Sequence, residues 1–156
     1  MHIFGSGDFE GLTIEQAILR DAPRLYEIMR WARDKRHPGL QNAIREFDIL
    51  RAKLRNASIT AECAQSGCQA TPTSMTLPID KYGCFHPTPY FWCDEHEPSE
   101  TRGISPKYPI HFDAISRMKT KGDRESIFSR LKSVLGIKPG TRISAVFAER
   151  FFAKLK

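Results

Sequence analysis

The chain has 156 residues, a mass of 17.8 kDa and a net charge of +6 at pH 7, which is the size of one domain or of two small modules. Hydrophobic residues make up 40% and charged residues 27%, so the composition excludes a disordered chain, and no apolar run is long enough to span a bilayer. The first five residues lack the basic start and long apolar stretch of a signal peptide, so we expect a cytoplasmic protein.

Residues 1–56 are predicted to form a short hairpin followed by helices. Ile3 and Phe9 lie on either side of residues 5–8, where two glycines permit the positive φ angles of a tight turn. Helical spacing of apolar residues then predicts three helices. Their predicted starts are Thr13 with Gln16 in a capping box, Asp21 with Pro23 in the first turn, and about residue 41 for a helix that ends near residue 56.

The first third of the chain also carries a pattern of turn glycines and apolar positions, made up of Phe4, Gly5, Gly7, Phe9, Gly11, Thr13, Ile14, Glu15, Asp21, Leu25 and Trp31. This pattern resembles the small carboxyl-terminal domain of exodeoxyribonuclease X-like proteins. The resemblance implies association with DNA-processing proteins, but it carries over no catalysis, because the nuclease's acidic metal-binding residues belong to another domain. A lysine usually lies between the glycines of the family pattern. Here the residues are Ser6, Asp8 and Glu10, which weakens any nucleic-acid contact from this hairpin.

Residues 57–111 are rich in Pro, Thr, Gly, Cys and His and have little helical periodicity, so this region needs a tether. In a reducing compartment, four cysteines are better explained as metal ligands or buried thiols than as disulfides. Residues 76–79 and 90–92 are predicted to be short strands that bring two ligand pairs together.

Two pairs of metal-ligating residues stand 24 residues apart in this region. Cys63 and Cys68 enclose a short loop in which Gly67 can take the turn, and Cys93 and His96 follow an aromatic strand. Zinc prefers four such ligands at tetrahedral angles, so the sequence predicts a structural Zn²⁺ site. The region resembles bacterial and phage zinc-ribbon or treble-clef-like modules that end in a Phe-Trp-Cys-x-x-His type sequence.

Two alternatives to this ligand set remain open at the level of sequence. Cys84 and His86 form a Cys-x-His pair that could replace one ligand or serve a neighbouring site, although we favour a buried thiol and a loop residue. All four cysteines could instead be ordinary buried thiols. Four protein ligands leave no coordination position for water, and the chain has no nuclease, nucleophile-elbow or phosphate-loop pattern, so we expect that it is not an enzyme.

Residues 112–156 are predicted to be helical. We expect one helix over 112–118, a second capped by Asp123 and ended by Gly136, and a terminal helix that begins at Thr141. The side chains expected to face inward in the last two helices are Ile127, Phe128, Leu131, Val134, Leu135, Ile143, Val146, Phe147, Phe151 and Leu155.

Positive charge is concentrated near the end of the chain, because residues 100–156 hold 13 basic and 5 acidic side chains. Such asymmetry indicates a polyanionic partner, although a solvated basic face is the alternative. The candidate nucleic-acid contacts are Arg117, Lys119, Lys121, Arg124, Arg130 and Lys132. A second basic cluster, partly offset by Asp34, consists of Arg30, Arg33, Lys35 and Arg36.

The sequence therefore predicts an α+β protein that is mainly helical, with a hairpin-plus-helices region at 1–56, a zinc-binding region at 57–111 and a basic helical region at 112–156. The predicted function is a small zinc-containing accessory protein that binds nucleic acid, DNA in particular, through a basic carboxyl-terminal face. The alternative is a protein-binding module, such as a phage or mobile-element factor that binds or inhibits a host nucleic-acid-processing enzyme.

Overall fold

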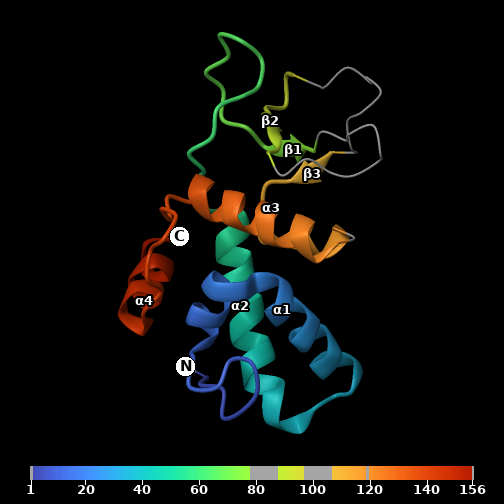
Figure 1. Cartoon of the computed structure of the whole chain (residues 1–156), viewed down its shortest axis with the longest axis vertical. Coiled ribbons are helices and arrows are strands. Elements are labelled where there is room, and N and C mark those ends of the chain that lie inside the picture. The colour runs from blue at the N-terminus through green and yellow to red at the C-terminus, as the bar shows by residue number, and fades with distance from the viewer. Residues whose placement is uncertain (1, 78–87, 97–106, 119, 156) are drawn as a thin grey trace. The chain divides into compact units, whose positions relative to one another are not determined.

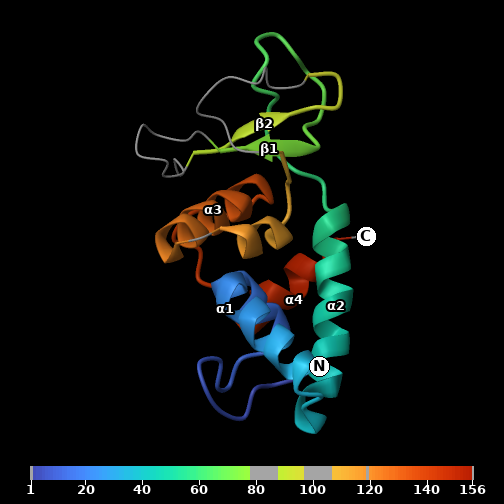
Figure 2. The same cartoon turned by 90° about the vertical axis from the view of Figure 1, so that its right-hand side faces the viewer.

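The computed structural model describes most of the chain, namely residues 2–77, 88–96, 107–118 and 120–155. Within these residues the chain has four α-helices and a three-stranded antiparallel sheet, so the predicted α+β class, mainly helical, is confirmed (Figures 1 and 2). The chain divides into two compact units, of which the first combines Met1–Ala57 with Gly140–Lys156 and the second is Ser58–Pro139. No helix in the described part is both long and apolar enough to cross a membrane.

This division differs from the three regions predicted from the sequence, because residues 112–156 are split between the two units. Residues 112–139 belong to the second unit, where the rings of Phe112 and Phe128 pack with centroids 5.1 Å apart. Residues 140–156 belong to the first unit. An apolar stripe predicts that a helix is buried, but it does not identify the partner against which the helix packs.

The first helix, α1 (Ile14–Asp34), begins with the predicted capping box. The Thr13 hydroxyl accepts a hydrogen bond from the Gln16 backbone N–H, and the Gln16 side chain accepts one from the Thr13 N–H, both at 3.2 Å. The helix is interrupted at Asp21, which has the non-helical angles φ −154° and ψ 72°. Asp21 then accepts a hydrogen bond from the Arg24 N–H at 3.1 Å, so the predicted second start appears as a capped kink inside α1.

The hairpin before α1 encloses a longer loop than the predicted turn at residues 5–8. A single antiparallel bridge joins Ile3 to Thr13, and the Gly11 N–H donates to the Phe4 carbonyl at 2.8 Å. Phe9 therefore lies inside the loop, where its ring is buried 5.6 Å from the ring of Phe4. Gly11 has a φ of +73°, which glycine adopts without steric cost and which lets the chain reverse.

The helix α2 (Gln41–Asn56) has the predicted bounds and follows a short 3₁₀ helix, η1 (Pro38–Leu40). It packs against α1, and the Phe47 ring meets the Tyr26 ring edge-on with centroids 5.0 Å apart. Phe47 is 1% exposed, so this contact lies at the centre of the first unit.

The last helix, α4 (Ala145–Lys154), also packs against α1, but it buries a different face from the predicted one. Ala148 and Phe152 are buried, whereas Val146 is 54% exposed. Apolar residues occupy more than half of the circumference of this helix, so their spacing does not determine which side is buried. The segment before α4 is also anchored to α1, because the Arg20 guanidinium donates to the Ile143 carbonyl at 3.0 Å.

The sheet of the second unit has the strand order β2-β1-β3, with both pairs antiparallel. The strands are β1 (Ser74–Thr76), β2 (Tyr90–Trp92) and β3 (Tyr108–Pro109). Met75 at the centre pairs with Phe91 on one side and Tyr108 on the other. The strand predicted at 76–79 starts earlier than expected, and its residues 78 and 79 lie outside the described residues. The strand β3 was not predicted from the sequence, because it is only two residues long and includes a proline.

Two helical segments complete the second unit, the 3₁₀ helix η2 (Phe112–Arg117) and the helix α3 (Lys121–Val134). The helix predicted over 112–118 is present as the 3₁₀ helix η2. Thr120, and not Asp123, is the N-cap of α3, because its hydroxyl accepts the Asp123 N–H at 3.1 Å. Gly136 ends α3 with a φ of +80°, as predicted.

The start of α4 provides a test of the capping assignment, because the structure and the sequence pattern name different residues. The Ser144 hydroxyl accepts the Phe147 N–H at 3.1 Å, whereas the sequence predicted a start at Thr141. We expect Ser144→Ala to lower the free energy of unfolding by about 1 kcal/mol, and Thr141→Val to lower it by much less. Urea unfolding followed by far-ultraviolet circular dichroism measures both changes, and a larger loss for Thr141→Val contradicts the assignment.

Candidate metal centre

Each pair of predicted ligands lies on its own tight turn. In the first turn the Cys68 N–H donates to the Gln65 carbonyl at 3.1 Å, and Gly67 takes a φ of +79°. Cys93 follows β2 directly, and the second turn closes with a hydrogen bond from the His96 N–H to the Cys93 carbonyl at 3.3 Å. Each turn thus brings its two ligand residues close together, and in the first turn the positive φ of Gly67 permits the tight reversal of the chain.

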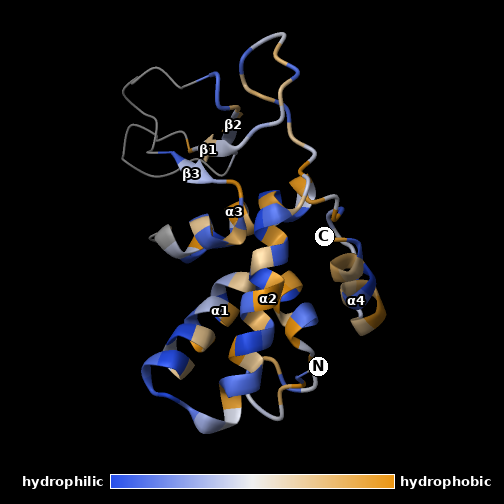
Figure 3. Cartoon of the chain, turned by 180° about the vertical axis from the view of Figure 1, so that it is seen from behind, coloured by the Kyte–Doolittle hydropathy of each residue, from blue (hydrophilic) through white to orange (hydrophobic). Residues whose placement is uncertain are grey.

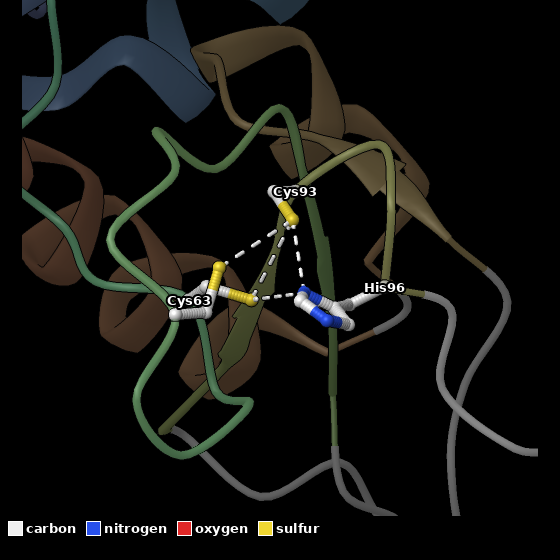
Figure 4. A group of neighbouring side chains, drawn as sticks. Cys63, Cys93 and His96 are labelled. Carbon is white, nitrogen blue, oxygen red and sulfur yellow. Dashed lines mark hydrogen bonds between the residues drawn. The ribbon is translucent and has the colours of Figure 1, made fainter.

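The two turns meet because each is attached to β2. The Ala64 N–H donates to the Phe91 carbonyl at 2.7 Å, which joins the first turn to the middle of the strand. On the other side of β2, the Thr73 N–H donates to the Trp92 carbonyl at 2.9 Å, next to the pairing with β1. Cys63 and the pair from the second turn consequently face a common point (Figure 4).

The ligand atoms have the spacing of a tetrahedral metal site. The Cys93 Sγ lies 3.9 Å from the Cys63 Sγ and 3.8 Å from the Cys68 Sγ. The His96 Nδ1 lies 3.2 Å from the Cys93 Sγ and 3.7 Å from the Cys63 Sγ, and all four ligand atoms lie within 4.8 Å of one another. Ideal tetrahedral bonds to Zn²⁺ place two sulfurs about 3.8 Å apart and a sulfur and a nitrogen about 3.6 Å apart. The four residues can therefore hold a metal ion.

The same distances exclude a disulfide among the described cysteines. A disulfide requires the two sulfurs to lie about 2.0 Å apart, whereas the shorter of the two sulfur–sulfur distances here is 3.8 Å. Cys63, Cys68 and Cys93 are free thiols. Their clustering without a covalent link is typical of metal-binding cysteines.

The electrostatic surroundings of Cys63 favour its thiolate. Burial raises the pKa of the Cys63 thiol, but hydrogen bonds from the backbone N–H groups of Cys93 and Gln65 oppose this effect. The side chains of His96 and Cys93 add further hydrogen bonds, and the net result lowers the pKa from 9.0 to about 6. The thiolate is the form that binds a metal, so the lowered pKa of Cys63 favours metal binding at neutral pH.

Cys68 behaves in the opposite way. A hydrogen bond from the Ala70 backbone lowers the pKa of Cys68, but burial and the neighbouring sulfurs of Cys93 and Cys63 outweigh it and raise the pKa above 9.0. Two negative thiolates so close together repel each other in the absence of a cation. A divalent ion at the centre removes this repulsion, and metal binding therefore releases protons from the site.

The cluster of four side chains is largely buried. Cys63 and Cys93 are 8% and 2% exposed, and Cys68 and His96 are half-buried. Four protein donors complete a tetrahedron, whereas a catalytic ion keeps one position for water or substrate. The competing pair Cys84 and His86 lies outside the described residues.

Four of the six predicted nucleic-acid contacts, Lys121, Arg124, Arg130 and Lys132, lie on α3. Lys121 forms an ion pair with Glu125 at 3.7 Å, and the Lys132 ammonium lies 4.5 Å from the centroid of the Phe128 ring. Arg124 is partly buried. Lys119 lies outside the described residues. Arg117 is the last residue of η2, and its side chain is not described.

Arg130, the remaining candidate, lines a pocket of about 340 Å³ in the second unit. The pocket is lined by Thr60, Ala61, Glu62, Phe91, Arg130, Ser133 and Val134. Its wall is fixed where the Thr60 N–H and hydroxyl donate to the Val134 carbonyl at 2.7 and 2.9 Å. This pocket was not predictable from the sequence, because its residues come from three separate segments and have no common spacing.

The division into units also changes where the excess positive charge lies. The first unit holds 14 basic and 9 acidic residues, whereas the second holds 10 basic and 9 acidic residues. The basic residues that are concentrated in positions 100–156 of the sequence are thus divided between the two units of the fold. Most of the net charge belongs to the helical first unit.

Comparisons with known proteins give no match for this chain, whether with family models, with curated proteins or with solved structures. The resemblances predicted for the first third and for the middle of the chain stay predictions.

Substitution of the ligands tests the metal centre directly. We expect Cys63→Ser and Cys93→Ser each to weaken metal binding strongly, because each change removes one thiolate and leaves three protein donors to hold the ion. Elemental analysis of the purified protein and competition with a chromogenic chelator measure the bound metal. Cys84→Ser is the matched control and should keep the full metal content. Loss of metal from this control, with retention in Cys63→Ser, would overturn the ligand set.

Proposed function

We propose that the chain is a small zinc-containing accessory protein that binds nucleic acid, DNA in particular, chiefly through its phosphates. The zinc part of the proposal is supported by the donor set, because three thiolates and an imidazole favour Zn²⁺ over Mg²⁺ or Ca²⁺, which prefer oxygen ligands. Distances between the donors also agree with tetrahedral Zn²⁺ bonds.

The proposed role of Zn²⁺ is to stabilise the second unit and not to catalyse a reaction. The described residues 58–73 contain no helix or strand, and they lead from the first unit to a sheet of very short strands. Such a segment buries too little apolar surface to hold its own shape. An ion that joins Cys63 and Cys68 to Cys93 and His96 supplies the missing connection, with binding free energies of about 10–16 kcal/mol in comparable structural sites.

The nucleic-acid part of the proposal is carried by the exposed cations of α3. Arg130 is exposed and forms no ion pair within the part of the chain that the structure describes. The Lys121 side chain is 84% exposed, and its contact with Glu125 is a solvent-screened pair that a phosphate can replace. DNA is proposed in particular because the predicted resemblance of the first third implies association with DNA-processing proteins.

A salt series with a short DNA duplex tests the phosphate contacts. Phosphate binding releases condensed counterions, so the affinity should fall steeply between about 50 and 200 mM salt. Replacing one phosphate-contacting cation should reduce the slope of log K against log salt by about 1. We expect this reduction for Lys121→Gln and for Arg130→Gln, measured by fluorescence anisotropy. Arg150→Gln, an exposed cation on α4, is the control of equal charge change.

Two outcomes would contradict this assignment. Equal slopes for Lys121→Gln, Arg130→Gln and the Arg150→Gln control would show that α3 is not the contact surface. Absence of duplex and single-strand binding at low salt would reject nucleic-acid binding altogether, and it would favour a module that recognises a nucleic-acid-processing protein.

A further inference from the structure

An exposed tryptophan lies near the end of α1 in the first unit. Trp31 exposes 50% of its surface, although tryptophan is usually largely buried in folded proteins. Leu25, Met29 and Ala32 of the same helix are fully buried, so the indole lies off the face that α1 buries. Packing within the first unit therefore leaves half of this side chain for another contact.

The indole is held in place by the turn that follows α1. The Trp31 carbonyl accepts the Lys35 N–H at 3.0 Å, and Arg36 takes a positive φ of 48°, which reverses the chain. The His37 ring then lies 5.5 Å from the indole, with an angle of 42° between the two planes. This contact restrains the indole, and a restrained side chain loses less entropy when a ligand binds.

Exposed cations lie close to this tryptophan along the chain. Of the four basic residues between positions 30 and 36, Arg33 forms an ion pair with Asp48. The other three, Arg30, Lys35 and Arg36, are exposed and form no ion pair with any described residue. Figure 3 shows the end of α1 and the following turn in hydrophilic colours. Asp34 offsets one of these charges, so the surface keeps a net positive charge beside a flat aromatic ring.

A structural explanation accounts for only part of this arrangement. Cations near the last turn of a helix interact favourably with its dipole, by about 0.3–1 kcal/mol each. The dipole explains why Arg33 and Lys35 stand at the end of α1. It does not explain a large apolar ring that is left half exposed among them.

A single-stranded nucleic acid matches both features. Its phosphates require cations, and its unpaired bases stack on exposed aromatic rings with little dependence on sequence. In a duplex the bases are already stacked on one another, so duplex DNA can use the cations but not the indole. We infer that the surface formed by Trp31 with Arg30, Lys35 and Arg36 binds single-stranded nucleic acid, one base of which stacks on the indole. The inference rests on the proposed nucleic-acid function and assigns it a second contact surface.

Binding of a fluorescein-labelled oligothymidylate, followed by anisotropy, tests this surface in the full-length zinc-loaded protein. Trp31→Ala should weaken binding about five- to a hundredfold, the range for loss of one base–aromatic stack. Trp31→Phe keeps an aromatic ring and should retain most of the affinity. Ile49→Ala removes another exposed apolar side chain of the same unit, which is 61% exposed, and should leave the affinity unchanged. Quenching of tryptophan emission by the unlabelled oligonucleotide should be lost in Trp31→Phe and gives a readout that does not depend on affinity.

Each failure has a different meaning. If the wild-type protein binds neither duplex nor oligothymidylate at low salt, the proposed function fails and the inference fails with it. If oligothymidylate binds but Trp31→Ala and Ile49→Ala bind it equally well, only the inference is overturned. Equal binding of poly-glutamate and oligothymidylate, with no effect of Trp31→Ala on either, would reduce the surface to a general anion-binding patch and would also overturn the inference.

Discussion

The meeting of two tight turns at one point is the constraint on which the second unit depends. The sheet beside these turns has strands of only two or three residues, too few to be stable alone. Pairing of β1 with β2 places Cys93 at a strand end, and the bond from Ala64 to Phe91 brings the first turn to the same strand. The sheet orients the donors, and an ion bound by the donors would in turn hold the sheet.

The clustering of the four predicted ligand side chains was predictable because its sequence signal is local. Two ligands separated by a short glycine-containing loop can reach one ion whatever surrounds them, so the spacing of Cys63, Cys68, Cys93 and His96 was sufficient. The start of α1 was predictable for the same reason, since a capping box involves only neighbouring residues. These are interactions between residues that are close in the chain.

Long-range packing was not predictable in this way. The buried face of α4 is selected by contact with α1, and apolar residues on several sides of α4 made Val146 and Ala148 equally good candidates for burial. The strand β3 exists because β1 offers it a free edge, and two residues carry no periodic signal. The distribution of charge was unpredictable for the same reason. The basic residues of the last third lie in one stretch of the sequence but belong to two different units of the fold.

The first unit is made from both ends of the described chain, with the whole second unit inserted between them. Its last part is bound tightly, since the Lys53 ammonium donates to the Phe152 and Leu155 carbonyls at 3.2 Å. Ribosomes release a chain from its amino end, and compact units generally fold as they emerge. The three cysteines and the histidine of the cluster are thus synthesised before α4. The four side chains can therefore bind an ion during translation, before the first unit has received α4, its last helix.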